Sequence, residues 1–350
     1  MPIKPEIHRP MTTRDVAAAA GVNQSTVSRA LRNDPKIRAE VRKKILKCAE
    51  QLGYRPNPYV SAFTASVRSY RRSPKGAVLG LLDCYPRESP YYHDRYYQAG
   101  AEKRARELGF QPEVFCFEDL NNSFKRLNKV LWTRSIQGLL VLPVPLGFNL
   151  SELEFDRLAS STVDTSLHLP VLHRAEPDYF QGMQLALQVL EARGYQRITF
   201  CTTRKEVKLL DEEWLGSFMG WQVMKPTPSR MEPFIGDTYE LGPFKAWFNK
   251  HRPDAIITNM DHYFKLCNEM GIGTSRVANI HLSADPNKVP KQAGVCQNQE
   301  DVGAAAVDLI LAQIHRNEFG LPTKPTKILI QSSWLDGPSV RSRAPKGDKA

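Results

Sequence analysis

The chain has 350 residues, of which 41% are hydrophobic and 24% are charged, and its formal net charge is +11. These values are typical of a globular protein that is long enough for two or three domains. The sequence has no run of eighteen apolar residues and no apolar N-terminal stretch, which argues against a membrane span and a secretion signal, so we expect a cytoplasmic protein.

The six cysteines are scattered along the chain without a close pair. This pattern argues against a zinc module or a disulfide framework and favours reduced thiols in the core. No phosphate-binding loop of the GxxxxGK(S/T) or GxGxxG type follows a predicted strand, and no GxSxG turn or HExxH pair occurs. We therefore expect no metal, no cofactor and no enzymatic activity.

The excess positive charge is confined to the first fifth of the chain. Residues 1–75 contain 16 Lys or Arg and 5 Asp or Glu, whereas residues 76–350 contain 32 of each kind. A compact basic segment ahead of a neutral body is typical of a polyanion-binding head on a sensing or catalytic domain. Charge alone leaves open a solvated surface that has no partner.

The basic segment contains three predicted helices, over 14–20, 24–31 and about 39–52. Gly21 follows the first helix, where a tight turn needs a residue that tolerates a positive φ. Two short helices joined in this way form a helix-turn-helix, which places its second helix in the major groove of DNA. Residues 11–56 therefore predict an all-α DNA-binding domain, with a three-helix bundle that has no DNA role as the alternative.

The second predicted helix carries Gln24, Ser25 and Arg29 on the side opposite its apolar residues. Gln and Arg side chains form paired hydrogen bonds with the edges of adenine and guanine, so we expect these three residues to read bases. Other polar residues of the head suit phosphate groups, which position the head without reading sequence. These residues are Thr12, Thr26, Ser28, Lys36, Arg42 and Asn57.

A short hinge helix can follow the head, because Asn57 is suited to cap it and Pro58 to start it. An isolated helix of two or three turns is marginal in water, so we expect it to form only when docked. We interpret Phe63 as an apolar wedge for a minor-groove base step, and its packing on the body is the alternative. Residues 57–75 are thus a predicted hinge helix and basic linker.

After the linker, short apolar runs alternate with helical stretches. The runs at 78–82, 138–142 and 255–258 predict strands, and the stretch at 96–108 is typical of the helices between them. This alternation predicts parallel sheets covered by helices on both faces, and the number of strands favours two doubly wound lobes. Ligands of such sheets bind at the carboxyl ends of the strands, here in the cleft between the lobes.

Several runs of the head resemble the LacI/GalR-type bacterial transcription regulators, the lactose/galactose/purine repressor family. They are Thr13 to Ala17, Gly21-Val22, Ser25 to Leu31 and Leu52 to Asn57. The resemblance implies a homodimer on a pseudo-palindromic operator, with repression as the commoner mode. It also places Gln24, Ser25 and Arg29 at the base-reading positions and Phe63 at the position of the intercalating hinge leucine. Arg38 departs from the family, which usually has a Ser or Thr cap there.

The rest of the chain resembles the periplasmic-binding-protein-like sensor of the same family, which implies the domain boundaries. We expect a flexible tail over 1–10, the helix-turn-helix domain over 11–56, the hinge and linker over 57–75, an effector-binding and dimerisation domain over 76–341, and a flexible tail over 342–350. Within the sensor we expect an N-terminal lobe over about 76–174 and 295–322, and a C-terminal lobe over about 175–294 and 323–341.

Six residues occupy positions where the family contacts its effector. They are Tyr91, Asp178, Glu213, Trp214, Asp261 and Ser283. Asp178 stands where Asn is usual, and Glu213 and Trp214 stand where an Arg is expected. An acidic pocket with aromatic rings suits a sugar or polyol, and the missing Arg disfavours purines and phosphorylated ligands. The alternative is that Trp214 is a core residue and the acids are merely solvated.

Three rivals to a regulator controlled by a small molecule follow from the sequence. An enzyme fused to a DNA-binding head is opposed by the missing catalytic motifs. A secreted solute-binding protein is opposed by the basic head and by the lack of a secretion signal. A DNA-binding regulator whose body has lost small-molecule binding and responds to a protein partner remains open, because several effector positions depart from the family.

Overall fold

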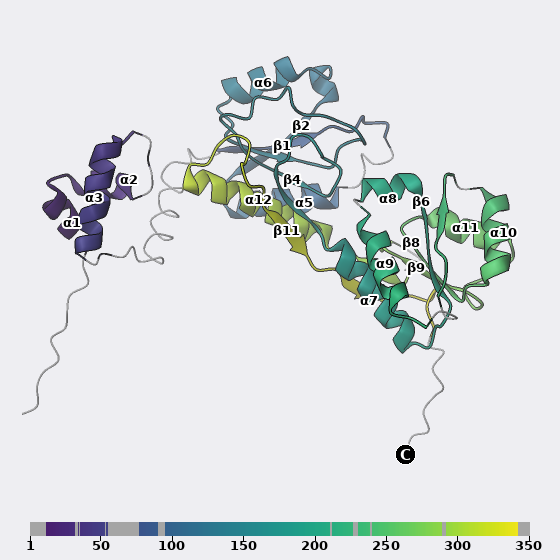
Figure 1. The fold of residues 1–350 in the computed structure, drawn as a ribbon. Coiled ribbons are helices and arrows are strands. Elements are labelled where there is room, and N and C mark those ends of the chain that lie inside the picture. Colours follow the sequence, from purple (N-terminus) through teal and green to yellow (C-terminus); the bar gives the residue numbers. More distant parts are fainter. Residues whose placement is uncertain are drawn as a thin grey trace, which may run out of the picture. The chain divides into compact units, whose positions relative to one another are not determined.

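A computed structural model gives the fold of the chain (Figure 1). It describes residues 12–31, 34, 36–52, 54, 77–89, 95–210, 212–226, 230–238, 240–288 and 292–341. The chain divides into two compact units, Met1–Pro74 and Lys75–Ala350, which we name the head and the body. Within the described ranges, no helix combines the length and the apolar character needed to span a membrane.

The described part of the head is a bundle of α1 (Thr13–Ala20), α2 (Gln24–Ala30) and α3 (Ala39–Gln51). Fully buried side chains from all three helices form its core, namely Val16, Ala20, Val27 and Ile45. Gly21 adopts a left-handed conformation with φ of 66° and ends α1. Glycine tolerates this conformation because it has no Cβ. The three predicted helices are confirmed to within one residue at each end.

The first sheet of the body contains six parallel strands in the order β11-β5-β4-β3-β1-β2. Their bounds are β1 Val78–Asp83, β2 Gln111–Cys116, β3 Gly138–Val141, β4 Ala159–Val163, β5 His173–Pro177 and β11 Lys327–Ile330. Successive residues face opposite sides, so Leu81 and Leu82 lie in different buried clusters.

Helices cover both faces of this first sheet. Helices α5 (Tyr96–Glu107) and α12 (Gln299–Arg316) pack on one face, and α6 (Phe124–Thr133) packs on the other (Figure 1). A short 3-10 helix, Glu118–Leu120, follows β2. We name this sheet with its helices the first lobe.

Two glycines allow α5 and α12 to touch backbone to backbone. A Cβ on Gly100 would lie 1.9 Å from the carbonyl oxygen of Glu300, and a Cβ on Gly303 would lie 2.0 Å from that of Tyr97. No side chain fits in either place. This contact joins segments that are some two hundred positions apart along the chain and fixes the distance between the two helices.

The second sheet has the order β12-β10-β9-β8-β6-β7, and only β12 pairs antiparallel with its neighbour among these strands. The bounds are β6 Ile198–Thr203, β7 Phe234–Gly236, β8 Ala255–Thr258, β9 Ala278–His281, β10 Gly294–Cys296 and β12 Ser333–Leu335. Phe200 and Cys201 face opposite sides and lie in separate buried clusters.

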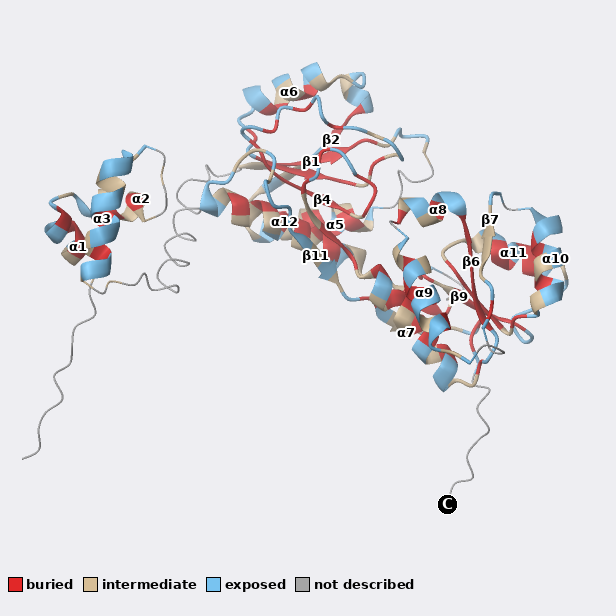
Figure 2. Cartoon of the chain, in the orientation of Figure 1, coloured by how far each residue is buried: buried red, intermediate tan, exposed pale blue. Residues whose placement is uncertain are grey.

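Helices also cover both faces of this second sheet. Helices α7 (Tyr179–Ala192) and α9 (Glu213–Val223) pack on one face, and α10 (Leu241–His251) and α11 (Asp261–Glu269) pack on the other. The short helix α8 (Arg204–Leu209) follows β6. This sheet with its helices is the second lobe, and Figure 2 shows burial concentrated in the strands and the inner helix faces of both lobes.

The described strands and helices pass between the lobes three times, from β5 to α7, from β10 to α12 and from β11 to β12. The sequence assigns 323–341 to the C-terminal lobe, but β11 pairs with β5 in the first sheet and only β12 lies in the second. A four-residue edge strand with alternating exposure carries no local signal of the sheet it joins. Together, the two sheets and the helical head confirm the predicted fold class.

Candidate DNA-binding surface and effector pocket

Helix α2 exposes polar residues on the side away from the head core. Val27 and Ala30 are buried, whereas Gln24 and Ser25 are exposed. Nε2 of Gln24 donates a hydrogen bond to Oγ1 of Thr13 at 2.8 Å, which joins the first turns of α1 and α2. The N-terminal residues of the second helix are those that contact base edges in a helix-turn-helix.

Arg29 is held in one direction by an ion pair. Its Nε lies 2.8 Å from Oδ2 of Asp34, while the arginine side chain remains 41% exposed. The hydrogen bond from Arg29 is the largest cause that lowers the pKa of Asp34, and the second is a backbone hydrogen bond from Lys36. A guanidinium with a fixed direction has less rotamer freedom to lose when it binds a base.

Two residues predicted to contact phosphates are hydrogen-bonded within the head. Oδ2 of Asp15 accepts hydrogen bonds at 2.7 Å from both the backbone N–H and the hydroxyl of Thr12, which caps α1. Nη2 of Arg42 donates to the carbonyl oxygens of Asp34 at 2.8 Å and Ile37 at 3.3 Å. Thr12 therefore caps α1, and Arg42 joins α3 to the segment that precedes it.

Of the remaining phosphate candidates, Lys36 is exposed, and Thr26 and Ser28 are half-buried on α2. Three further predicted site residues lie outside the described residues, namely Asn57, Phe63 and Tyr91. The roles expected of these six residues stay predictions.

A cavity of about 770 Å³ lies between the two lobes of the body. Its lining residues follow the carboxyl ends of β1, β3 and β4 in the first lobe and of β6, β8 and β9 in the second. Parallel α/β sheets bind ligands at this edge, and the volume is in the range of small-molecule sites. The polar lining residues include Asp83, Asp164, Glu206, Asn259, His281 and Gln297.

Two aromatic rings form part of the cavity wall. The rings of Tyr179 and Trp214 meet edge to face, with 5.2 Å between centroids and an interplanar angle of 88°. The hydroxyl of Tyr179 donates to Oδ1 of Asp164 at 2.6 Å, and burial raises the pKa of this phenol. Trp214 is only 5% exposed, so most of its surface packs in the core of the second lobe.

His281 lines the cavity as a neutral ring, because burial lowers its pKa. Its Nδ1 accepts a hydrogen bond from the backbone N–H of Ser283 at 3.0 Å, so the proton of the neutral ring is on Nε2. Nε2 lies 3.7 Å from Oδ1 of Asp261, whose Oδ2 is 2.7 Å from Nζ of Lys288. Asp261 therefore pairs with Lys288 beside a ring that lines the cavity.

The model of the lacI family of bacterial regulatory proteins matches residues 12–57. MalR, a transcriptional regulator of Streptococcus pneumoniae, is 25% identical over 323 residues, which cover 88% of this chain and 94% of MalR. A CelR–cellobiose complex has a TM-score of 0.52 at 18% identity and covers 95% of this chain and 99% of its own. The lac repressor dimer bound to operator and the anti-inducer ONPF has a TM-score of 0.51 at 17% identity. This match covers 94% of this chain and 98% of the repressor chain. Residues 12–57 of this chain thus form a DNA-binding domain of the lacI family.

The head therefore carries a DNA-binding domain, and MalR, which matches most of the chain, is a transcriptional regulator. Of the residues expected to contact effector, Trp214 and Ser283 line the cavity. Three others are not among its lining residues. Asp178 caps α7, Glu213 forms an ion pair with Lys327 on β11, and Asp261 forms one with Lys288.

The sequence prediction misses most of the carboxylates and amides that do line the cavity. Asp83 ends β1, and Asp164 and Asn259 directly follow β4 and β8. A polar residue at the end of a buried apolar run is a signal that could have identified these three. Glu206 and Gln297 stand apart from their strands or follow a very short one, so no comparable signal marks them.

Proposed function

We propose that the chain is a homodimeric, cytoplasmic repressor that binds a pseudo-palindromic operator and is controlled by a small carbohydrate or sugar derivative. In this proposal Gln24, Ser25 and Arg29 read bases from the major groove. The observation that carries it is the presence, in one chain, of an exposed polar face on α2 and of a ligand-sized cavity between two lobes. Homodimers suit operators with two half-sites, because each recognition helix then enters its own major groove.

The lining of the cavity supports a carbohydrate as the ligand. Asp83, Asp164 and Glu206 supply carboxylate acceptors, Asn259 and Gln297 supply amides, and two aromatic rings supply apolar surface. Sugars carry many hydroxyl donors and an apolar ring face, which match this combination. The similarly folded CelR binds cellobiose in its complex.

Polar contacts across the cleft offer a means of control. The hydroxyl of Tyr96 on α5 donates to Oδ2 of Asp285 in the second lobe at 2.9 Å, and Oγ1 of Thr165 donates to the carbonyl oxygen of Leu209 at 2.7 Å. A ligand that binds both lobes competes with or reinforces these contacts and thereby changes the tilt of one lobe on the other. Coupling of this kind is typically worth about 1–3 kcal/mol.

The test of the DNA-reading assignment is the variant Arg29→Ala. A lost base contact of about 1–3 kcal/mol lowers operator affinity roughly 10-fold or more, while ligand binding in the body is retained. The operator is obtained by selecting genomic DNA fragments with the wild-type protein, and affinity is measured by fluorescence anisotropy.

The matched control is Arg106→Ala. Arg106 lies on α5 of the body, is 61% exposed, and forms a comparable ion pair with Glu102 at 2.7 Å. Its removal leaves operator affinity unchanged. Equal operator affinities for Arg29→Ala and the wild type would contradict the assignment of α2 as the reading helix. A monomer in sedimentation velocity, with and without operator, would contradict the homodimer.

A further inference from the structure

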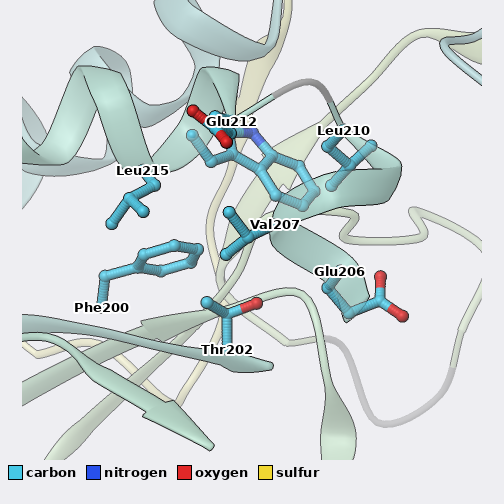
Figure 3. Close-up of a pocket in the computed structure, with 8 residues that line it drawn as sticks. Phe200, Thr202, Glu206, Val207, Leu210, Glu212 and Leu215 are labelled. Carbon is cyan, nitrogen blue, oxygen red and sulfur yellow. The ribbon is translucent and has the colours of Figure 1, made fainter. Parts of the chain in front are cut away.

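Glu206 lies on α8, the helix that directly follows β6. Only 8% of Glu206 is exposed, and it lines the large cavity between the lobes. It also lines a second cavity of about 10 Å³, formed with Phe200, Thr202 and Leu215. Figure 3 shows the carboxylate of Glu206 directed away from Phe200 and Leu215. A space of about 10 Å³ admits at most one water, so a ligand reaches Glu206 from the large cavity.

The buried carboxylate of Glu206 has an amide as its partner. Its Oε2 accepts a hydrogen bond from Nδ2 of Asn259 at 3.0 Å. In the part of the chain that the structure describes, Glu206 forms no ion pair with a Lys, Arg or His. A buried charge is costly unless it is paired with an opposite charge or receives several hydrogen bonds, and one amide donor satisfies only part of this need.

Two neighbouring polar atoms also lack hydrogen-bond partners. Oγ1 of Thr202, a residue that is 1% exposed, and Oδ1 of Asn259 are both buried without a partner in the described structure. Because Nδ2 of Asn259 is already bonded to Glu206, the accepting atoms in this group outnumber the donors. Oγ1 of Thr202 and Oδ1 of Asn259 are closed to a ligand by their burial, whereas Oε1 of Glu206 is not among the buried atoms, so a donor from the large cavity reaches Glu206.

We infer that Glu206, held in place by Asn259, binds a donor group of the ligand and decides which ligands the cavity accepts. This inference rests on the proposed function, since it concerns the same cavity. The shared chemistry is a group rich in donors, either neighbouring hydroxyls or an ammonium group. A ligand that presents a carboxylate or phosphate to Glu206 is repelled, because two anions would be buried together.

The experiment uses the full-length protein and a matched set of probes. Glucose, cellobiose, ribose, glucosamine and glucuronate are first compared by thermal shift, and the dissociation constants of the probes that bind are then measured by calorimetry. Neutral or amino sugars raise the Tm of the wild type more than glucuronate does, because glucuronate must place its carboxylate away from Glu206, toward Arg95 or Lys205, which also line the cavity. Glu206→Gln weakens a ligand held through hydroxyls roughly 10-fold, and one held through an ammonium group roughly 100-fold or more, since the charge itself is lost.

The control variant is Asp237→Asn. Asp237 is exposed and pairs with Arg204 at the start of α8. The substitution therefore removes a carboxylate that is near the same helix but outside the cavity. Asp237→Asn binds each probe with the same affinity as the wild type. The Tm of the ligand-free Glu206→Gln protein equals or exceeds that of the wild type, because the substitution removes an unpaired buried charge.

Two results would overturn the inference while the proposed function survives. One is that Glu206→Gln and the wild type bind the probes with the same affinity. If the Tm of Glu206→Gln is also lower than that of the wild type, Glu206 has a purely structural role. The other is glucuronate binding as tightly as glucosamine. If no sugar in the set binds the wild type, the carbohydrate part of the proposed function falls together with the inference.

Discussion

In the head, the three candidate base-reading residues lie within six positions on one short helix, whereas the cavity of the body is lined from strand ends that are spread over more than two hundred positions. The difference extends to the bonds that support each site. Gln24 and Arg29 are held by Thr13 and Asp34, which are near them in the sequence. In the body, Glu206 accepts a hydrogen bond from Asn259, which is 53 positions away in the sequence.

This comparison shows that a local motif can position a site through short-range contacts alone. A cleft needs the whole tertiary structure, because its parts reach one edge only after both sheets have formed. Substitutions at long-range contacts of the body test the comparison most directly. All five tryptophans lie between residues 132 and 334, so their fluorescence reports unfolding of the body without a contribution from the head.

The largest effect is expected for Lys327→Met. Nζ of Lys327 lies 2.6 Å from Oε1 of Glu176 and 3.3 Å from Oε1 of Glu213, and it therefore connects β5, β11 and α9. Glu176 is fully buried, and burial raises its pKa against the opposing influence of Lys327. Because the variant leaves this carboxylate without its main partner, we expect a loss of about 2–4 kcal/mol in the free energy of unfolding, measured in urea.

An exposed ion pair provides the control for that loss. Lys250 lies 4.0 Å from Glu232, and both side chains are more than half exposed. Lys250→Met costs at most about 0.5 kcal/mol, because solvent screens such pairs. Equal losses in the two variants would show that the connection between β5, β11 and α9 contributes no more than a surface contact.

A pair of glycine substitutions in the body should change stability in opposite directions. Gly100→Ala forces a Cβ against the backbone of α12, so we expect a loss of about 1–3 kcal/mol or more. Gly216 lies on α9 with nothing within 4 Å of an added Cβ, and Gly216→Ala should stabilise by up to about 1 kcal/mol through helix propensity. Urea unfolding compares both with the wild type, and a stable Gly100→Ala protein would refute the close approach of α5 and α12.

The smallest effect is a dependence of stability on pH that separates the body from the head. Burial lowers the pKa of His281 below its usual value near 6.5, whereas the described residues of the head contain no histidine. As the pH falls below about 6.5, the unfolded chain takes up a proton that the folded body resists. The free energy of unfolding of the body therefore decreases, by at most about 1.4 kcal/mol per pH unit for this residue.

Tryptophan fluorescence during urea unfolding at pH 7.5 and pH 5.5 measures this dependence. His281→Gln makes the profile flatter than that of the wild type, while above about pH 6.5 the two profiles run parallel. A steeper loss below pH 6.5 in His281→Gln than in the wild type would reverse the sign and contradict the neutral state of His281.

Features that depend on residues close together in the sequence are predicted well, and features that depend on distant residues are not. The three head helices are predicted to within one residue, because helix caps, Gly21 and the spacing of apolar residues act within a few positions. The strands β1, β3 and β8 are predicted from apolar runs in the same way. The sheet that β11 joins is not predicted, because strand pairing depends on residues that are far apart in the sequence.

The candidate effector residues show the same limit. Trp214 and Ser283 line the cavity as expected, but Asp178, Glu213 and Asp261 do not. Each of these three carboxylates is bound to another donor. Asp178 accepts a hydrogen bond from the first turn of α7, and Glu213 and Asp261 form ion pairs with lysines. The sequence shows that a carboxylate is present near a strand end but not which donor it will bind.

The order of residues by itself determined that this protein has a basic helical head of the lacI type and an α/β body in two lobes, because charge, periodicity and motif spacing are properties of neighbouring residues. Only the tertiary structure decided which polar groups face the cavity and which are used to hold the lobes together. The physical reason is that buried donors and acceptors must find partners, and the partners available depend on how the whole chain packs.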